Sequence, residues 1–69
     1  MDSKKLGKRI RLARVEADLT QTELARKMDA KQKSISRYET GDSVPSVETL
    51  VKLAKVLKKA TAYFLDELA

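Results

Sequence analysis

The sequence contains no cysteine, histidine or tryptophan, and only one proline and two glycines among its 69 residues. The lack of cysteine and histidine excludes disulfides, the usual zinc sites, and any nucleophile or base that depends on a thiol or an imidazole. Carboxylate pairs could still carry out acid–base chemistry, but a chain this short has little room for a closed pocket. We therefore expect a binding protein and not an enzyme, with no cofactor, no metal ion and no small-molecule ligand.

Long apolar runs are also missing, because charged residues make up 36% of the chain and interrupt the apolar stretches after a few residues. No stretch approaches the length of a membrane span, and no charged-then-apolar signal segment opens the chain. The absence of cysteine is compatible with a reducing compartment. We expect a soluble, cytoplasmic protein that forms one domain over residues 1–69, near the lower size limit for a core without disulfides or metals.

Acidic residues are in the minority, and the imbalance is confined to one half of the chain. Residues 1–40 hold 11 Lys and Arg against 6 Asp and Glu, whereas residues 41–69 hold 4 of each, so the net charge of +5 belongs to the first half. Clustered Lys and Arg favour a polyanionic partner, because they displace condensed counterions from phosphates. Many small basic proteins bind no nucleic acid, so the charge alone leaves the partner open.

No segment alternates as a strand does, and helical periodicity runs through the whole sequence. The pattern predicts an all-α fold of five helices, without repeats or interdomain linkers. The expected helices are residues 4–17, a short helix after Thr20, and residues 32–40, 47–58 and 62–68. The turn between the second and third helices is short, near Asp29–Lys31, and it forces the two helices to cross at a steep angle.

Capping residues mark where these helices begin and end. Thr20 and Glu23 form a capping box, in which each side chain accepts a hydrogen bond from the backbone N–H of the other residue. Ser46 and Thr61 are suited to cap the starts of the fourth and fifth helices. Gly41 is suited to the left-handed conformation that ends the third helix.

Apolar residues at spacings of three and four define the inner faces of the helices. The expected inner residues are Leu6, Ile10, Ala13 and Ala17 in the first helix, Leu24, Ala25 and Met28 in the second, and Leu50, Leu53, Ala54 and Leu57 in the fourth. Val47 and Val51 widen the stripe of the fourth helix, which we therefore expect to be central and well covered. Leu12 and Val15 fall outside the stripe of the first helix.

The third helix carries several long hydrogen-bonding side chains on one face. On a helical wheel of about 100° per residue, with Gln32 at zero, Ser36 lies at about 40°. On the same wheel Lys33 and Arg37 lie near about 100° and about 140°. An amide, a hydroxyl, an ammonium and a guanidinium are the groups that read base edges in the major groove of DNA. An ordinary solvated face is the alternative, and the neighbouring segments decide between the two.

Those segments resemble the helix-turn-helix family of the phage Cro and CI repressors, also called the Xre family. "LTQTELARKM" is similar to the family's second helix, and "QKSISRYETG" is similar to its recognition helix and glycine stop. "PSVETLVKLAKVL" is similar to the fourth helix, and "TAYFL" to the end that closes the core. The resemblance covers about Leu6 to Leu65. It implies a compact five-helix, lambda-repressor-like domain whose helix-turn-helix occupies about residues 20–41.

The resemblance implies a transcriptional regulator, a repressor or an autoregulated controller, that binds double-stranded DNA by sequence and is encoded by a prokaryote or a phage. The implied base-reading residues are Gln32, Lys33, Ser36 and Arg37. The implied contacts to the DNA backbone are Gln21, Thr22, Lys31 and Ser46, aided by backbone N–H groups at two helix starts that point at phosphates. Gln21 would also buttress the next side chain.

Arg14 and Glu39 match positions that commonly form an ion pair in this family, and we expect this pair to be at least partly buried. Two positions depart from the family's pattern. Asp29 stands where the turn usually has glycine, at an expected cost of roughly 1 kcal/mol for a left-handed backbone. Lys31 stands where a serine or threonine cap is usual, and a lysine cannot cap the helix, although it can approach a phosphate.

A symmetric dimer is expected, because one recognition helix reads only a few base pairs. The common arrangement places two half-sites one helical turn apart, about 34–36 Å. Apolar residues outside the expected core, on the neutral half of the chain, are the candidates for its interface: Val44, Tyr63 and Leu68. Leu12 and Val15 form a second apolar pair that could serve a different contact. The alternative is that these are scattered exposed apolar residues, which are normal on any surface.

Two other functions stay open. A protein-interaction module, such as an adaptor or the antidote half of a toxin–antidote pair, could use the same scaffold. Such a module has no need for Gln32, Lys33 and Arg37 together. RNA binding is compatible with the charge, but readers of single-stranded RNA usually present stacking aromatics, and the three aromatic residues here lie at expected core or C-terminal positions.

Overall fold

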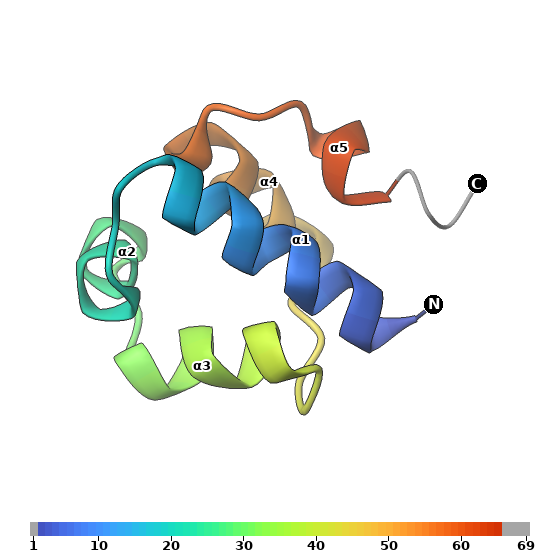
Figure 1. Ribbon diagram of the computed structural model, residues 1–69, viewed down its shortest axis with the longest axis horizontal. Coiled ribbons are helices and arrows are strands. Elements are labelled where there is room, and N and C mark those ends of the chain that lie inside the picture. Colours follow the sequence, from blue (N-terminus) through green and yellow to red (C-terminus); the bar gives the residue numbers. More distant parts are fainter. Residues whose placement is uncertain (1, 66–69) are drawn as a thin grey trace.

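The computed structural model describes residues 2–65, and this part of the chain contains five helices and no strand (Figure 1). The helices are α1 (Ser3–Glu16), α2 (Gln21–Met28), α3 (Gln32–Thr40), α4 (Val47–Leu57) and α5 (Thr61–Leu65). α1 crosses the middle of the molecule and packs against α3 on one side and α5 on the other, while α2 contacts α3 and α4. The prediction of an all-α, five-helix fold is confirmed.

The starts of the helices follow from local side-chain caps. Glu23 N–H donates to the Thr20 hydroxyl at 3.0 Å and Thr20 N–H donates to the Glu23 carboxylate at 2.9 Å, so the capping box is confirmed. Ser46 caps α4 as predicted, since its hydroxyl accepts from Thr49 N–H at 3.2 Å. Asp2 caps α1 by accepting from two backbone N–H groups, a cap that was not predicted from the sequence.

The bounds of three predicted helices are shifted by one residue. α1 runs from Ser3 to Glu16 and not from residue 4 to residue 17. Thr61 is the first residue of α5 and not the residue before it, because the Tyr63 N–H bonds to the Ala60 carbonyl and closes the turn earlier. α4 ends at Leu57, since Lys58 adopts a left-handed backbone with φ 56°, which cannot continue a right-handed helix. The predicted continuation of the last helix to Leu68 lies outside the described residues.

Residues with a left-handed backbone end both helices of the helix-turn-helix. Asp29 ends α2 with φ 54° and ψ 44°, and the next N–H, that of Ala30, donates to the Ala25 carbonyl at 2.8 Å. Gly41 ends α3 with φ 87°, as predicted. Lys31 precedes α3 and makes no side-chain cap, which agrees with the expectation for a lysine. The Asp-for-Gly departure therefore leaves the turn intact, because aspartate tolerates the left-handed region better than most residues.

The core draws on all five helices. Its fully or nearly fully buried side chains are Leu6, Ile10, Ala13, Leu24, Ala25, Met28, Ile35, Leu50, Leu53, Ala54, Leu57 and Phe64. Most of the predicted inner residues are among them. Lys52 adds a polar tie, since its ammonium group donates to the Met28 carbonyl at 3.1 Å and so joins α4 to the last turn of α2.

Three predicted core residues are exposed instead. Val47 is 78% exposed and Val51 is 36% exposed, so the prediction that they widen a well-covered stripe is wrong. They lie at the edge of the α4 stripe, where the neighbouring helices leave that side of α4 uncovered. Ala17 is exposed because α1 ends at Glu16 and the chain turns away before Ala17 can face the core.

α1 passes close to the end of α3 at Gly7. A Cβ atom placed on Gly7 would stand 2.5 Å from the carbonyl oxygen of Glu39 and 2.6 Å from that of Tyr38. Both neighbours are backbone atoms, which cannot rotate away as a side chain does. Gly7 therefore sets the distance between α1 and the recognition helix, and a larger residue would push the two helices apart.

Candidate nucleic-acid interface

α3 separates its side chains into a buried and an exposed face. Ile35 and Glu39 are buried, whereas Gln32, Lys33 and Arg37 are exposed and Ser36 is half-buried. The wheel drawn from the sequence grouped the four polar side chains on one face, whereas the burial of Glu39 was expected only through the family resemblance. The exposed face carries two cations and an amide, which together can approach phosphates and base edges.

A chain of side-chain hydrogen bonds runs from α1 to the start of α3. The Arg14 guanidinium donates to both carboxylate oxygens of Glu39, at 2.6 Å and 3.1 Å, and a third donor of the same group bonds to the Leu19 carbonyl at 2.8 Å. Gln21 Nε2 donates to Glu39 Oε1 at 3.0 Å. Gln32 Nε2 then donates to Gln21 Oε1 at 2.6 Å. α1, α2 and α3 all contribute to this chain.

The carboxylate of Glu39 determines the direction of every hydrogen bond in the chain. An ionised carboxylate only accepts, so Gln21 must turn its NH₂ group toward Glu39. The carbonyl oxygen of Gln21 is then left to accept from Gln32. One N–H and the carbonyl oxygen of Gln32 stay available, which is the donor and acceptor pair that matches adenine in the major groove.

The Arg14–Glu39 pair is well shielded from water. The side chain of Arg14 is 13% exposed and that of Glu39 is 4% exposed. The structure thus contains the expected ion pair, in a bidentate geometry that orients both groups. Because Glu39 also accepts from Gln21, the pair supports the exposed Gln32 as well as the contact between α1 and α3.

The helix starts present further polar groups. Gln21 and Thr22 occupy the first turn of α2, where backbone N–H groups have no partner within the helix. The Thr20 backbone N–H and then the Thr20 hydroxyl lower the pKa of the exposed Glu23 carboxyl from its usual 4.5. Lys31, just before α3, is exposed. The Ser46 hydroxyl already bonds to Thr49, so Ser46 can offer a phosphate mainly the N–H groups that follow it.

The candidate dimer residues differ in how far they are available. Val44 is 48% exposed, while Tyr63 is half-buried because its ring packs edge-on against Phe64 and lies under Arg9 and Lys59. Leu68 lies outside the described residues. Val47 and Val51, which were expected in the core, are exposed on α4, and Val44 is exposed in the loop just before this helix. We call Val44, Val47 and Val51 the valine patch.

Several contributors to the site were missed from the sequence. Gly7 could have been found, since a glycine inside a helical pattern often marks a close approach. The bond from Gln21 to Glu39 carried no local signal, because its partners are 18 residues apart along the chain. The bond between Gln21 and Gln32, which are 11 residues apart, was expected only through the family resemblance, in which Gln21 buttresses the next side chain. Residues 2–65 hold no cluster of side chains suited to a metal ion. Within the same part, no helix has the length and apolar character needed to cross a membrane.

Comparison with known proteins places the chain in a family. A helix-turn-helix family model matches residues 10–64. The transcriptional regulator ImmR of Bacillus subtilis is 38% identical over 62 residues, covering 90% of this chain. Multiprotein-bridging factor 1 of Candida albicans is 44% identical over 52 residues, covering 75% of this chain. The chain spans only 49% and 34% of the lengths of these two relatives.

A solved structure extends the likeness to the whole fold. The P22 c2 repressor in complex with a synthetic operator superposes with a TM-score of 0.80 at 29% identity, covering 86% of this chain and 89% of the repressor chain. Residues 10–64, which the family model matches, contain the capping box, the Asp29 turn, α3 and its glycine stop. The chain therefore belongs to the helix-turn-helix family of the phage Cro and CI repressors.

Proposed function

We propose that the protein is a transcriptional regulator that binds double-stranded DNA by sequence, with α3 in the major groove of a pseudo-palindromic operator. The observation that carries this proposal is the directed hydrogen-bond chain that ends at Gln32. An exposed amide held in one orientation by a buried ion pair suits the reading of a base edge. Lys33 and Arg37 on the same face supply the two cations that such a surface needs.

The proposed contacts divide into two kinds. Gln32, Lys33, Ser36 and Arg37 read bases, and Gln21, Thr22, Lys31 and Ser46 position the DNA backbone. The one remaining N–H of the Gln21 side chain is free to meet a phosphate, because its other N–H and its oxygen are used within the chain of hydrogen bonds. Gln21 would thus link a phosphate contact to a base contact. We propose further that the protein acts as a repressor or an autoregulated controller in the cytoplasm of a prokaryote, in line with the bacterial relative that is named as a transcriptional regulator.

Three similar proteins bear on this proposal. ImmR and the P22 c2 repressor are named as a regulator and a repressor, and the second is seen with an operator. The Candida relative is named as a bridging factor, which fits the alternative of a protein-interaction module on the same scaffold. The polar face of α3 favours DNA, because an adaptor gains nothing from an oriented Gln32 beside Lys33 and Arg37.

Selection of bound duplexes from a random pool tests the proposal directly. We expect an enriched inverted repeat, with half-sites about one helical turn apart, and binding that weakens steeply with salt. Gln32→Ala should abolish the preference at one base pair of each half-site. Failure to retain any duplex at low salt would refute DNA binding and leave the interaction module.

We also propose that two copies bind each operator through the valine patch, with Tyr63 and Leu68 as further candidates. The three valines are exposed on the neutral half of the chain, where two copies would not repel each other. Sedimentation with a palindromic duplex should show two proteins per duplex. Val47→Asp should reduce this to weak, independent binding without unfolding the protein, since Val47 is 78% exposed. A saturated complex of one protein per duplex would refute the dimer.

A further inference from the structure

The outer side of α1 carries a second exposed apolar surface. Leu12 is 58% exposed and Val15 is 57% exposed, although both are large aliphatic residues on a helix whose other side is fully buried. Lys8 and Arg11 flank them, and the four residues line a shallow depression of about 290 Å³. We call Lys8, Arg11, Leu12 and Val15 the α1 patch.

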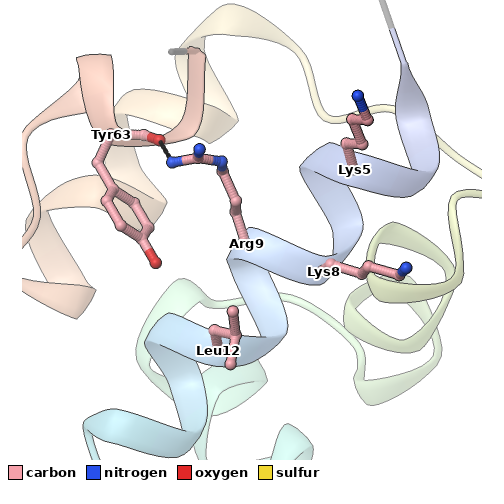
Figure 2. Close-up of a pocket in the computed structure, with 5 residues that line it drawn as sticks. All are labelled: Lys5, Lys8, Arg9, Leu12 and Tyr63. Atoms are coloured by element: carbon pink, nitrogen blue, oxygen red, sulfur yellow. Dashed lines mark hydrogen bonds between the residues drawn. The ribbon is translucent and has the colours of Figure 1, made fainter. Parts of the chain in front are cut away.

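The α1 patch continues into a larger hollow between α1 and α5. Lys8 and Leu12 also line a cavity of about 520 Å³ whose other walls are Lys5, Arg9 and Tyr63 (Figure 2). Arg9 reaches from α1 to α5, since its guanidinium donates to the Tyr63 carbonyl at 2.7 Å and lies 5.3 Å from the centre of the Tyr63 ring. Leu12 and Val15 thus form the apolar part of the α1 patch, and the contact between Arg9 and Tyr63 forms one wall of the adjoining hollow.

The α1 patch points away from both the core and α3. At about 100° per residue, Lys8, Leu12 and Val15 lie within about 60° of one another on α1. Gly7 and Arg14, which meet α3, lie to one side of them, and Leu6, Ile10 and Ala13 face the core on the opposite side. A molecule bound at the α1 patch would therefore leave the core and the polar face of α3 undisturbed.

We propose that the α1 patch docks an acidic amphipathic helix of a partner protein, with apolar side chains against Leu12 and Val15 and carboxylates beside Lys8 and Arg11. Every charged residue that lines the α1 patch and the adjoining cavity is positive. A second copy of this chain would bring like charges together, so the patch is unsuited to self-association. A phosphate backbone would satisfy the cations but would gain nothing from two exposed aliphatic side chains.

This surface is separate from the proposed DNA contacts, so a partner could be held while α3 occupies a groove. The geometry suits a partner helix with two apolar residues spaced by three or four positions. Helices that bind in hydrophobic grooves usually present their apolar residues at this spacing. Carboxylates on the flanks of that helix would steer its approach and make the binding weaken with salt.

A designed peptide tests the inference on the full chain. The probe is a capped synthetic helix with leucines along one face and glutamates on both flanks, titrated into isotope-labelled protein and followed by amide chemical shifts. We expect the shift changes to centre on Lys8, Arg11, Leu12 and Val15. The same helix with lysines in place of the glutamates should leave the spectrum unchanged. Shifts centred on α3 or on the valine patch, or no binding by the acidic peptide, would overturn the proposal.

Substitutions locate the contact independently of the spectrum. Leu12→Glu should weaken the peptide at least about tenfold, because it removes the apolar contact and adds a like charge. Lys8→Glu offers a second route if Leu12→Glu fails to fold. Lys55→Glu is the matched control for Lys8→Glu, as it makes the same charge change at an exposed lysine on α4 outside the proposed surfaces, and it should leave the affinity unchanged. Equal weakening by Lys8→Glu and Lys55→Glu would reject a specific site.

Binding in the presence of DNA separates this inference from the proposed function. Peptide affinity should be the same with and without a saturating duplex, because the two surfaces are distinct. The peptide should also bind if the protein proves to bind no DNA at all. Displacement of the peptide by a duplex with no change at α3 would show that the α1 patch is a nucleic-acid contact, and it would overturn the proposal.

Discussion

The exposed face of α3 has two edges, and the scaffold treats them differently. On one edge, Gln32 is held by Gln21, which is held in turn by Glu39 and Arg14. On the other edge, Lys33 and Arg37 are exposed, and among residues 2–65 no side-chain hydrogen bond is formed by either. The Gln32 side chain is therefore oriented before a partner binds, whereas the Lys33 and Arg37 side chains become ordered only when they contact the partner.

This difference predicts how the two edges share the work of binding. Ordering a long side chain at an interface costs about 0.5–1.5 kcal/mol, so Lys33 and Arg37 lose part of their contact energy to entropy. Gln32 avoids most of that loss because its orientation is already set. We therefore expect the Gln32 edge to discriminate most sharply between bases, and the Lys33 and Arg37 edge to adapt to neighbouring sequences.

Removing Arg14 should have the largest effect on the difference between the two edges of α3. Arg14→Ala leaves Glu39 buried without its cation, which should cost about 3 kcal/mol of stability. It should also release Gln21 and Gln32, so the ordered edge becomes as mobile as the other. Urea unfolding measures the first effect, with Arg11→Ala as the control, since Arg11 is exposed on the same helix. An unchanged unfolding midpoint for Arg14→Ala would contradict the role assigned to the pair.

Gly7→Ala tests the packing that brings the chain of hydrogen bonds together. Alanine is favoured over glycine in a helix by roughly 0.5–1 kcal/mol, whereas overpacking costs about 1–3 kcal/mol. The contacts of 2.5 and 2.6 Å are to backbone oxygens, so we expect the clash to outweigh the helix preference and the melting temperature to fall. Lys8→Ala, at the next and exposed position, should change it little. A rise in the melting temperature of Gly7→Ala would show that α1 and α3 separate freely.

Arg37→Ala tests whether the edge of α3 formed by Lys33 and Arg37 reads bases. Loss of this guanidinium should reduce discrimination by about 1–3 kcal/mol at one base pair of each half-site. Lys31→Ala should weaken all duplexes alike and flatten the salt dependence, since it is assigned to the DNA backbone. Binding to the selected duplex and to random DNA at several salt concentrations separates the two. If Arg37→Ala weakens both duplexes equally, Arg37 contacts only the backbone.

The smallest expected effect concerns the capping box, which fixes the helix start that carries Gln21. The pKa of Glu23 is lowered from 4.5, so its contribution to stability is present above that value and is lost as the pH falls through the folded-state pKa. Glu23→Gln removes this titration. Thermal unfolding should show the parent protein more stable than the variant near neutral pH, with the gap closing in acid. A gap that does not vary with pH would argue against an ionised cap.

Signals between near neighbours in the chain were readable from the sequence. The capping box, the Ser46 cap, the Gly41 stop and the inner faces of α1, α2 and α4 depend on residues within about one or two turns of each other. The polar face of α3 was readable for the same reason. The Arg14–Glu39 pair was expected only through a family resemblance, because its residues lie 25 positions apart.

Exposure at the edges of helices was decided by the tertiary structure. Val47 and Val51 have the spacing of core residues, yet the neighbouring helices leave them open, and this made the valine patch available. Leu12 and Val15 were placed outside the stripe from spacing alone, but the cations and the hollow beside them follow from how α1 meets α5.

The five helices, the turn at Asp29 and the polar face of α3 could be predicted from the sequence, because periodicity and capping act over a few neighbouring residues. The close packing of α1 against α3 at Gly7, and the orientation of Gln21 and Gln32 by Glu39, could not be predicted in this way. Those contacts require helices distant in sequence to meet at one distance and angle, and packing of the shared core sets both.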